Sequence, residues 1–322
     1  MTLSRTADGT TMMDGPKTFS VITPTYKGRE RLEGVIRSLE SQTLPALEWI
    51  VVMDGYDSDT EAVALSANGR LKIDVKVLSI ERNHKKAAVN AGVAAARGFF
   101  CLIADDDDEF PPDAIRRLAD AWESLSPEEQ RRSAGVTGLC VDEAGNIIGD
   151  RFPTDRYHAS ALECSLVSGV RGEKWGMQRT DLLRRFPFFE EAEGYIGEST
   201  VWFRIAEEHR TLYINEVVRI YKFNPVSIIN SHYDREKIRT NCQAWAYGYK
   251  HPVENYLRYF FHNPRFFFGC SVGYVRNTLH SASFGKYRSW MSPLTSPSAF
   301  IGFLLGAPAA LILFARDRTR FA

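Results

Sequence analysis

The chain lacks an excess of charge of either sign. Its 322 residues include 40 Lys and Arg and 40 Asp and Glu, so the formal net charge at pH 7 is zero. A protein that binds nucleic acid through its phosphates usually carries a basic surface field, and a balanced composition does not supply one. Nucleic acid is therefore not an expected partner.

The sequence also has few cysteines and no export signal. The five cysteines are widely spaced and form no Cys-x-x-Cys or Cys/His pattern of the kind that binds zinc. Their odd number fits a reducing cytosol better than a disulfide framework. Residues 1–17 are polar and have no apolar core, so we expect a disordered lead and a cytoplasmic protein.

What the sequence does contain is an abrupt change of polarity. The apolar run 99–104 is followed directly by five carboxylates, at positions 105–109. Such a run is typical of a strand that is buried on both faces and ends at a fixed edge of a sheet. Carboxylates held this close repel one another, and a divalent cation relieves the repulsion. We therefore expect a metal site, and the alternative is a solvated acidic loop.

Apolar runs alternate with segments of helical spacing along the first third of the chain. This alternation predicts an α/β fold with a mostly parallel, Rossmann-like sheet, flanking helices and right-handed crossovers. The expected strands are residues 19–23, 49–53, 75–80 and 99–104, and the expected helices are residues 32–39, 58–68 and 86–97, with Asp57 to Asp59 as the cap of the second helix and Gly98 as the stop of the third.

The ends of these strands carry the polar residues of the region. In a parallel sheet the carboxyl ends meet at one edge, where open α/β sheets bind ligands. Residues 23–26, Asp54, 83–86 and 105–108 would then line one crevice, which suits a nucleoside diphosphate. Asp54 would accept from a base or ribose, although Asp54-Gly55 is also a common turn dipeptide.

These motifs, in this order, carry a family resemblance. Thr-Pro-Thr-Tyr at 23–26, Val-Val-Met-Asp-Gly at 51–55, the segment 83–92 and the acidic run at 105–109 resemble family 2 glycosyltransferases of the GT-A fold. The resemblance covers residues 18–225 and implies a D-x-D element that binds Mg²⁺ or Mn²⁺ through Asp105 and Asp107. The donor-binding residues that we expect are Thr23, Pro24, Thr25, Tyr26, Asp54, Lys86, Asp105, Asp106 and Asp108.

Two positions depart from the family pattern on the donor side. Met53-Asp54 stands where the family usually has Asp-Asp, and the segment from Asn83 to Asn90 is one residue short, with Lys85 and Lys86 in place of its usual glycine. These departures concern the identity of the donor more than the fold.

The second half of the chain carries the expected base. Gly197 to Arg204 resembles the family segment G-E-D-x-x-x-W-x-R, in which a carboxylate deprotonates the acceptor hydroxyl. The usual Asp is Ser199 here, so Glu198 is the expected base. Glu198 also suits the first turn of a helix for structural reasons alone, and Glu190, Glu191 and Glu193 are nearby alternatives.

Other residues are expected on the acceptor and phosphate sides. Trp175, Arg179 and Trp202 resemble acceptor-side positions, and Trp175 is equally well explained as a core residue. A basic cluster, His232, Arg235, Lys237 and Arg239, suits contact with phosphate or, for His232, weakly with a metal. A solvated helix face explains that cluster almost as well.

The C-terminal region, 226–322, is predicted to be a helical extension. Residues 299–315 contain no charge, include Pro308 and are followed by Arg316, Arg318 and Arg320. The segment is short for a membrane crossing, so we expect an interfacial or re-entrant element. A buried helix or a subunit interface is the alternative, and homo-oligomerisation stays open.

Together these features predict a metal-dependent inverting glycosyltransferase. It would transfer a single hexosyl or N-acetylhexosaminyl group from a nucleotide-diphosphate sugar, with UDP-sugar preferred, to a glycan or lipid-linked acceptor in cell-surface polysaccharide synthesis. The predicted location is the cytoplasmic face of the cell membrane. The alternative is a binding protein that keeps the fold without the activity, which Ser199 suggests. Nucleotidyl transfer is disfavoured because a Gly-rich phosphate loop after the first strand is missing.

Overall fold

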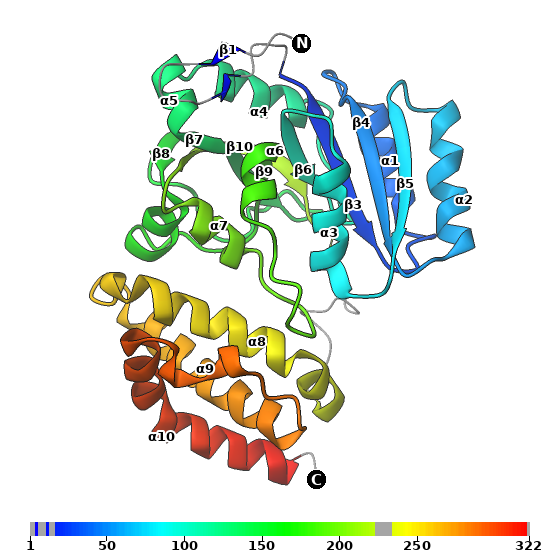
Figure 1. Ribbon diagram of the computed structural model, residues 1–322. Helices are drawn as coiled ribbons and strands as arrows, with labels where there is room; N and C mark the ends of the chain where they lie inside the picture. The colour runs from blue at the N-terminus through cyan, green and yellow to red at the C-terminus, as the bar shows by residue number, and fades with distance from the viewer. Residues whose placement is uncertain (1–3, 6–10, 13–16, 223–233, 321–322) are drawn as a thin grey trace.

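An eight-stranded sheet forms the centre of the molecule (Figure 1). The computed structural model describes residues 4–5, 11–12, 17–222 and 234–320. The strands of this sheet are β3 (Phe19–Thr25), β4 (Glu48–Asp54), β5 (Asp74–Ile80), β6 (Phe100–Ile103), β7 (Ser133–Val141), β8 (Arg156–Ala159), β9 (Lys174–Arg179) and β10 (Arg210–Ile220). Two further strands, β1 (Ser4–Arg5) and β2 (Thr11–Met12), pair antiparallel with each other.

The strand order is β5-β4-β3-β6-β9-β7-β10-β8. All strands run in one direction except β9 and β8, which are antiparallel to their neighbours. Strand β9 lies between β6 and β7, and glycines permit this close fit. A Cβ on Gly135 of β7 would collide with the Met177 carbonyl, and one on Gly176 of β9 would collide with the Val136 carbonyl. The sheet is therefore mostly parallel, as predicted.

Helices cover both faces of the sheet. Alternate residues of the central strands enter opposite cores: Val21 packs with α1 and α4 residues, and Ile22 packs with α3, α6 and α7 residues. Because both faces are buried, β3 and β4 are buried along their whole lengths. The flanking helices are α1 (Leu32–Glu40), α2 (Ser58–Ser66), α3 (His84–Ala95), α4 (Ala114–Glu123), α5 (Pro127–Arg132), α6 (Thr180–Arg185) and α7 (Ser199–Ile205), with short helices η1 (Ala67–Gly69) and η2 (Glu163–Val167).

The predicted elements of the first third are present, with one local correction. Asp57 caps α2, since its carboxylate accepts from the Thr60 amide at 3.0 Å. Helix α3 begins at His84 and ends at Ala95, so Gly98 does not stop it through a positive φ. Gly98 is required instead because a Cβ there would contact the backbone of Ser20 at 2.5 Å.

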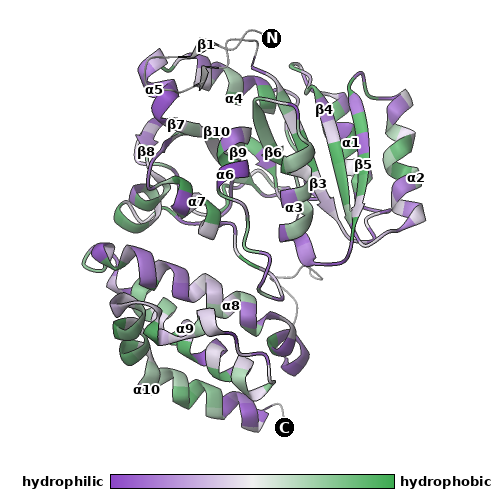
Figure 2. Ribbon diagram, viewed as in Figure 1, coloured by the Kyte–Doolittle hydropathy of each residue, from purple (hydrophilic) through white to green (hydrophobic). Residues whose placement is uncertain are grey.

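Three helices form a bundle after the sheet. They are α8 (Arg235–Tyr256), α9 (Pro264–Ser283) and α10 (Pro297–Arg320), connected by the short helices η3 (Leu257–Tyr259), η4 (Ser289–Met291) and η5 (Pro293–Thr295). In Figure 1, α8 faces the sheet and α10 lies on the opposite side of the bundle. Figure 2 shows that α10 is largely apolar, in contrast to α8.

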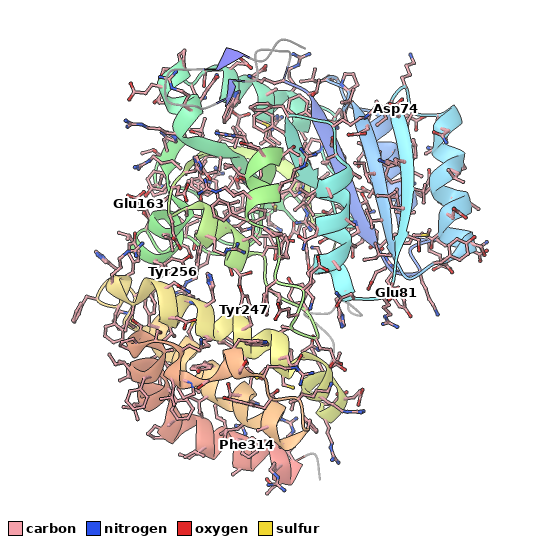
Figure 3. All side chains as sticks on the ribbon, in the orientation of Figure 1. Asp74, Glu81, Glu163, Tyr247, Tyr256 and Phe314 are labelled. Atoms are coloured by element: carbon pink, nitrogen blue, oxygen red, sulfur yellow. The ribbon has the colours of Figure 1, made fainter. Side chains whose placement is uncertain are left out.

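Hydrogen bonds and an ion pair attach the bundle to the loops below the sheet. The Tyr195 amide donates to Asn241 of α8 at 2.9 Å, and the Tyr256 hydroxyl donates to Glu207 at 2.6 Å. Tyr256 is labelled in Figure 3, on the side of α8 that faces α7. Lys286 forms an ion pair with Glu193 at 2.8 Å. The bundle is therefore held at the edge of the sheet where the strands end.

Candidate active site

A cavity of about 1080 Å³ opens at the carboxyl ends of β3, β4 and β6. Pro24, Thr25 and Tyr26 line it at the end of β3, and Asp54 lines it at the end of β4. The start of α7 and the first turns of α8 also contribute, so the cavity combines segments between residues 24 and 241. This is the edge at which open α/β sheets bind ligands.

The donor-side residues are held by specific contacts. The Asp54 carboxylate accepts from the Asn83 amide at 2.7 Å, which joins the ends of β4 and β5. The Arg82 guanidinium lies 4.0 Å from the centre of the Tyr26 ring and donates to its hydroxyl at 2.9 Å. Thr23 does not line the cavity. Its side chain is fully buried, and its hydroxyl accepts from Trp49 Nε1 at 2.9 Å.

The acidic run divides into two groups. Asp105, Asp106 and Asp107 line the cavity, whereas Asp108 and Glu109 do not. Asp106 accepts from Arg31 at 2.8 and 2.7 Å and from the Thr25 hydroxyl at 2.5 Å. Asp108 is buried, and Arg219 of β10 donates to it at 2.7 Å.

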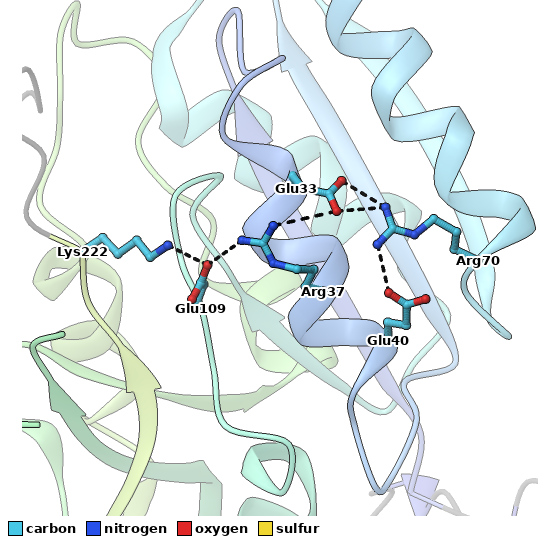
Figure 4. A network of polar contacts seen from close by, with 6 residues as sticks. All are labelled: Glu33, Arg37, Glu40, Arg70, Glu109 and Lys222. Carbon is cyan, nitrogen blue, oxygen red and sulfur yellow. Dashed lines mark hydrogen bonds and ion pairs between the residues drawn. The ribbon is translucent and has the colours of Figure 1, made fainter.

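Glu109 does not line the cavity and belongs to an ion-pair network (Figure 4). Lys222 contacts its carboxylate at 2.6 Å and Arg37 contacts it at 3.2 Å. Arg37 also approaches Glu33, which Arg70 binds at 3.0 Å. A solvated acidic loop is therefore not what the structure shows, because most of these carboxylates have a basic partner.

Lys85 connects two sides of the cavity, the acidic run after β6 and the start of α7. Its ammonium lies 2.6 Å from Asp105 and 2.8 Å from Glu198. Burial alone would lower the pKa of Lys85, but the carboxylates of Asp105 and Glu198 outweigh it and hold that pKa well above its usual value. Burial would likewise raise the pKa of Asp105, and the cations Lys85 and Arg219 bring it below its usual value instead. Lys85 and Asp105 are therefore both charged at neutral pH.

Lys86, the neighbour of Lys85, does not line the cavity. Its ammonium is buried and donates to the carbonyls of Ala192 and Gly194. Burial lowers the pKa of Lys86 to about 8. Consecutive residues on a helix point about 100° apart, so only one of the two lysines faces the cavity. The structure places Lys85 in the position expected for Lys86.

Glu198 stands at the N-terminal end of α7 and lines the cavity together with Ser199 and Trp202. Its carboxylate is about one-third exposed, at 32%. Of the neighbouring alternatives, Glu190 accepts from Asn90 at 2.7 Å and Glu193 binds Lys286. The residues that line the cavity in the described structure do not include Glu190, Glu191 or Glu193.

The residues predicted on the acceptor side have different positions in the structure. Trp175 lines the cavity but is buried, donates to the Ile103 carbonyl at 2.6 Å and stacks on Phe110, with 5.2 Å between the ring centres. This arrangement favours its role as a core residue. Arg179 lies away from the cavity, where it binds Asp181 at 2.6 Å.

The basic cluster at the start of α8 is only partly described. His232 lies outside the described residues, so its expected contact with phosphate or metal has no structural outcome. Lys237 lines the cavity, whereas Arg239 contacts Glu236 at 3.5 Å. The N-terminal turns of α8 therefore close one side of the cavity.

Several cavity residues were not foreseen from the sequence. Arg31, Arg82, Glu173, Tyr195 and Arg219 all line the cavity. Burial raises the pKa of the Tyr195 hydroxyl to about 12. Arg31 immediately precedes α1, so a basic residue shortly after the first strand was a usable signal. Arg219 gave no such signal, since it meets Asp108 across 111 positions of sequence.

The acidic run suits a divalent cation that shares its ligands with a phosphate. Asp105 and Asp107 line the same cavity and offer carboxylate oxygens. Within the described ranges, no group of three His, Cys, Asp or Glu side chains is placed to hold a metal ion by itself. Mg²⁺ is commonly held by one or two carboxylates together with substrate phosphates and water. The donor set therefore fits a metal that binds with a phosphate-bearing ligand.

Solved structures share this fold. TarS from S. aureus, residues 1–349, in complex with UDP-GlcNAc, matches with a TM-score of 0.60 at 16% identity, over 94% of this chain and 92% of that one. The mannosyltransferase PcManGT from Pyrobaculum calidifontis, in complex with GDP-Man and Mn²⁺, matches with a TM-score of 0.54 at 18% identity, over 94% and 82% of the two chains. The chain thus has the GT-A fold.

Sequence comparison gives the family of the first part of the sheet domain. Residues 20–127 match the family described as Glycosyl transferase family 2. This part of the chain belongs to glycosyl transferase family 2. A Campylobacter jejuni relative, GalNAc(5)-diNAcBac-PP-undecaprenol beta-1,3-glucosyltransferase, is 28% identical over 210 residues, which are 63% of this chain and 64% of that protein. A Rickettsia prowazekii glycosyltransferase, RP339, is 24% identical over 202 residues.

The family 2 match has clear limits along the chain. It runs from β3 through α4 and includes Asp54 and the acidic run, but it ends before Glu198. The alignments cover 64% and 62% of the lengths of these two relatives, which is less than two thirds. The assignment of Glu198 therefore rests on its position in the cavity.

Proposed function

We propose that this chain is a metal-dependent inverting glycosyltransferase that transfers one sugar from a nucleotide-diphosphate donor to a hydroxyl acceptor. One observation carries the proposal: a single cavity contains Asp54, Asp105, Asp107 and Glu198. This arrangement brings a nucleotide-binding edge, carboxylates suited to a metal and a candidate base within reach of one ligand.

The residues divide the reaction between them. Asp54, Thr25 and Tyr26 bind the nucleotide at the ends of β4 and β3. Glu198 takes the proton of the acceptor hydroxyl while the acceptor oxygen bonds to the anomeric carbon and the bond from that carbon to the diphosphate breaks. The products are the glycosylated acceptor and a nucleoside diphosphate, and the proton remains on Glu198. This single displacement inverts the anomeric configuration.

The metal has a limited role in this proposal. Asp105 and Asp107 would hold Mg²⁺ or Mn²⁺, which when bound neutralises charge on the diphosphate. Lys85 keeps Asp105 and Glu198 near each other despite their like charge, because its ammonium lies between them.

We also propose the chemical class of the donor and of the acceptor. The UDP-GlcNAc complex of TarS supports a UDP-sugar donor, of hexosyl or N-acetylhexosaminyl type. The name of the Campylobacter relative, which contains a PP-undecaprenol acceptor, supports a lipid-linked or glycan acceptor in cell-surface polysaccharide synthesis. Such an acceptor implies a cytoplasmic enzyme at the inner face of the cell membrane.

The proposal is tested with two variants and one control. Asp107→Asn is expected to abolish the Mn²⁺-dependent rise in melting temperature that a UDP-sugar produces, because a bound ligand stabilises the folded state. Glu198→Gln should keep that rise and lower sugar transfer by about 100- to 10,000-fold. Glu191→Gln, an exposed neighbour that does not line the cavity, serves as the control. Near-normal transfer by Glu198→Gln would place the base elsewhere.

A second function is favoured by Ser199, which lines the cavity where the family usually has Asp. In that case the protein binds nucleotide sugars or glycans without transfer. Nucleotide binding by the wild type together with undetectable donor hydrolysis and transfer would support this alternative.

A further inference from the structure

The outer face of α10 is apolar over four turns. Its exposed positions from 300 to 315 fall at helical spacing, and none of them carries a polar side chain. Ile312 is 71% exposed, Leu304 is 56% exposed and Leu311 is 55% exposed. The exposed stripe consists of Phe300, Ile301, Leu304, Leu305, Pro308, Leu311, Ile312 and Ala315. Side chains of this size are normally buried in a soluble protein.

The inner face of the same helix has the opposite composition. Within the uncharged part of α10, the buried positions are small, namely Ala299, Gly302, Gly306 and Ala310. A Cβ on Gly302 would collide with Val253 of α8, and one on Gly306 would collide with the Ser271 backbone of α9. The helix therefore packs closely through small residues and directs its large apolar residues outward, a distribution found in helices that face lipid.

A buried ion pair fixes α10 to the bundle in this orientation. Asp317, near the end of α10, is 3% exposed and contacts Arg276 of α9 at 2.6 Å and His280 at 2.9 Å. The ring of His280 also lies 4.8 Å from that of Phe314, which is labelled in Figure 3. Separating α10 from α9 would leave these charges unpaired, which is costly. The apolar stripe therefore cannot turn inward without breaking this contact.

The C-terminal end of the stripe carries positive charge on its exposed surface. Arg316 and Arg318 follow it on the exposed surface, while Asp317 between them is neutralised inside the bundle. An apolar face next to exposed arginines complements a membrane whose headgroups are anionic.

We propose that α10 lies in the plane of an anionic membrane, with its exposed stripe inserted among the lipids and its arginines at the headgroups. Among the described helices, α10 alone is long and apolar enough to cross a membrane. The uncharged part of α10, residues 297–315, is about 28 Å long, a little less than a hydrocarbon core of about 30 Å. The charged residues Arg276 and Lys250 on the adjacent helices also oppose burial of the whole bundle. This inference rests on the proposed function only for the choice of membrane, which is the inner leaflet of the cell membrane.

This placement bears on the catalytic cavity. Helix α8 packs against α10 and, with its first turns, also lines the cavity. A membrane bound through α10 would then hold the cavity at a fixed height above the lipid surface, where a lipid-linked acceptor is presented.

Binding of the full chain to vesicles tests the inference. We expect sedimentation with vesicles of phosphatidylcholine and phosphatidylglycerol, and weaker sedimentation with phosphatidylcholine alone. Leu304→Glu combined with Ile312→Glu should weaken binding at least about tenfold, since charge on the inserted face opposes partition. Leu65→Glu, which changes an exposed apolar residue of α2, is the matched control and should bind like the wild type.

A second measurement reports the orientation. All five native cysteines are buried, so cysteines introduced as Leu304→Cys and Ile312→Cys can be labelled selectively with an environment-sensitive dye. For an in-plane helix, a quencher placed at shallow depth in the lipid should quench both dyes to the same extent. Unequal quenching that reports different depths would show a crossing helix and overturn the inference.

Two further outcomes would also overturn it. One is a wild-type protein that does not bind either kind of vesicle. The other is a dimer in light scattering that becomes a monomer on Leu304→Glu and Ile312→Glu, with no vesicle binding, which would assign the face to a second copy of the chain. Nucleotide-induced stabilisation, measured on the same variants, separates a failure of this inference from a failure of the proposed chemistry.

Discussion

Lys85 is expected to hold two carboxylates of the site in place. Its ammonium is the cation that lies between Asp105 and Glu198. Lys85→Met would leave these two carboxylates to repel each other, which moves both from their positions. We expect sugar transfer to fall by about 100-fold, as when one preorganised electrostatic contact is lost. Steady-state kinetics measure this effect.

Lys85→Arg is the matched control, because it keeps the charge. It should retain more activity than Lys85→Met at a similar melting temperature. Transfer by Lys85→Met within twofold of the wild type would show that the bridge has no catalytic role.

The pair formed by Asp108 and Arg219 is expected to matter for stability. Both side chains are buried, at 2% and 8% exposure. Arg219→Met leaves the Asp108 carboxylate without its cation, so the free energy of unfolding should fall by about 3–5 kcal/mol. Arg37→Met is the comparison, since Arg37 is 58% exposed in the network of Figure 4 and its loss should cost less than about 1 kcal/mol. Chemical denaturation measures both, and equal losses would contradict the prediction.

At the scale of elements, α8 contains a histidine that makes the bundle sensitive to acid. His251 is buried, and this burial lowers its pKa to about 4 from the ordinary 6.5. Below pH 6.5 the unfolded chain takes up a proton that the folded chain refuses, so stability falls as the pH drops toward 4. The expected loss through His251 is about 2 kcal/mol between pH 7.5 and pH 5.

His251→Phe tests this effect, because it keeps an aromatic ring beside Tyr247 and Tyr256 and cannot take up a proton. Its melting temperature should depend less on pH than that of the wild type. His262→Gln, at an exposed position, should keep the wild-type dependence. Parallel pH profiles for His251→Phe and the wild type would refute the assignment.

Some of the strands could be predicted from the sequence, whereas the contacts between them could not. The strands β3, β4 and β6 were read from the sequence because burial on both faces forces an uninterrupted apolar run, as in Trp49 to Met53. The partner of Asp108 could not be read from the sequence. Arg219 reaches Asp108 through the arrangement of distant strands and loops, which leaves no local pattern.

For the whole molecule, the convergence of strand ends predicted which segments would share the cavity. Residues 24–26, Asp54 and Asp105 to Asp107 are together there. The choice between Lys85 and Lys86 was beyond the sequence, because it follows from the rotation of α3. The contribution of α8 was also unforeseen in detail, because it depends on how the bundle docks.

Removal of the C-terminal segment, 294–322, would be a poor test of the membrane-binding helix. It would take Asp317 away from Arg276 and expose the faces of α8 and α9 that pack on Gly302 and Gly306. Substitutions on the outer stripe leave these contacts intact, which is why they test location without disturbing the cavity.

The reversed strand β9 has a consequence for the order in which the protein takes shape during synthesis. Strand β6 has no direct pairing with β7, since β9 lies between them. A nascent chain that has emerged only as far as Val141 contains β7 but neither of its neighbours, β9 and β10. Both edges of β7 stay unpaired until β9, which ends at Arg179, has left the ribosome, and one edge stays unpaired until β10, which ends at Ile220, has followed. Unpaired edges are sites of aggregation, so this interval is when the growing chain most needs a chaperone.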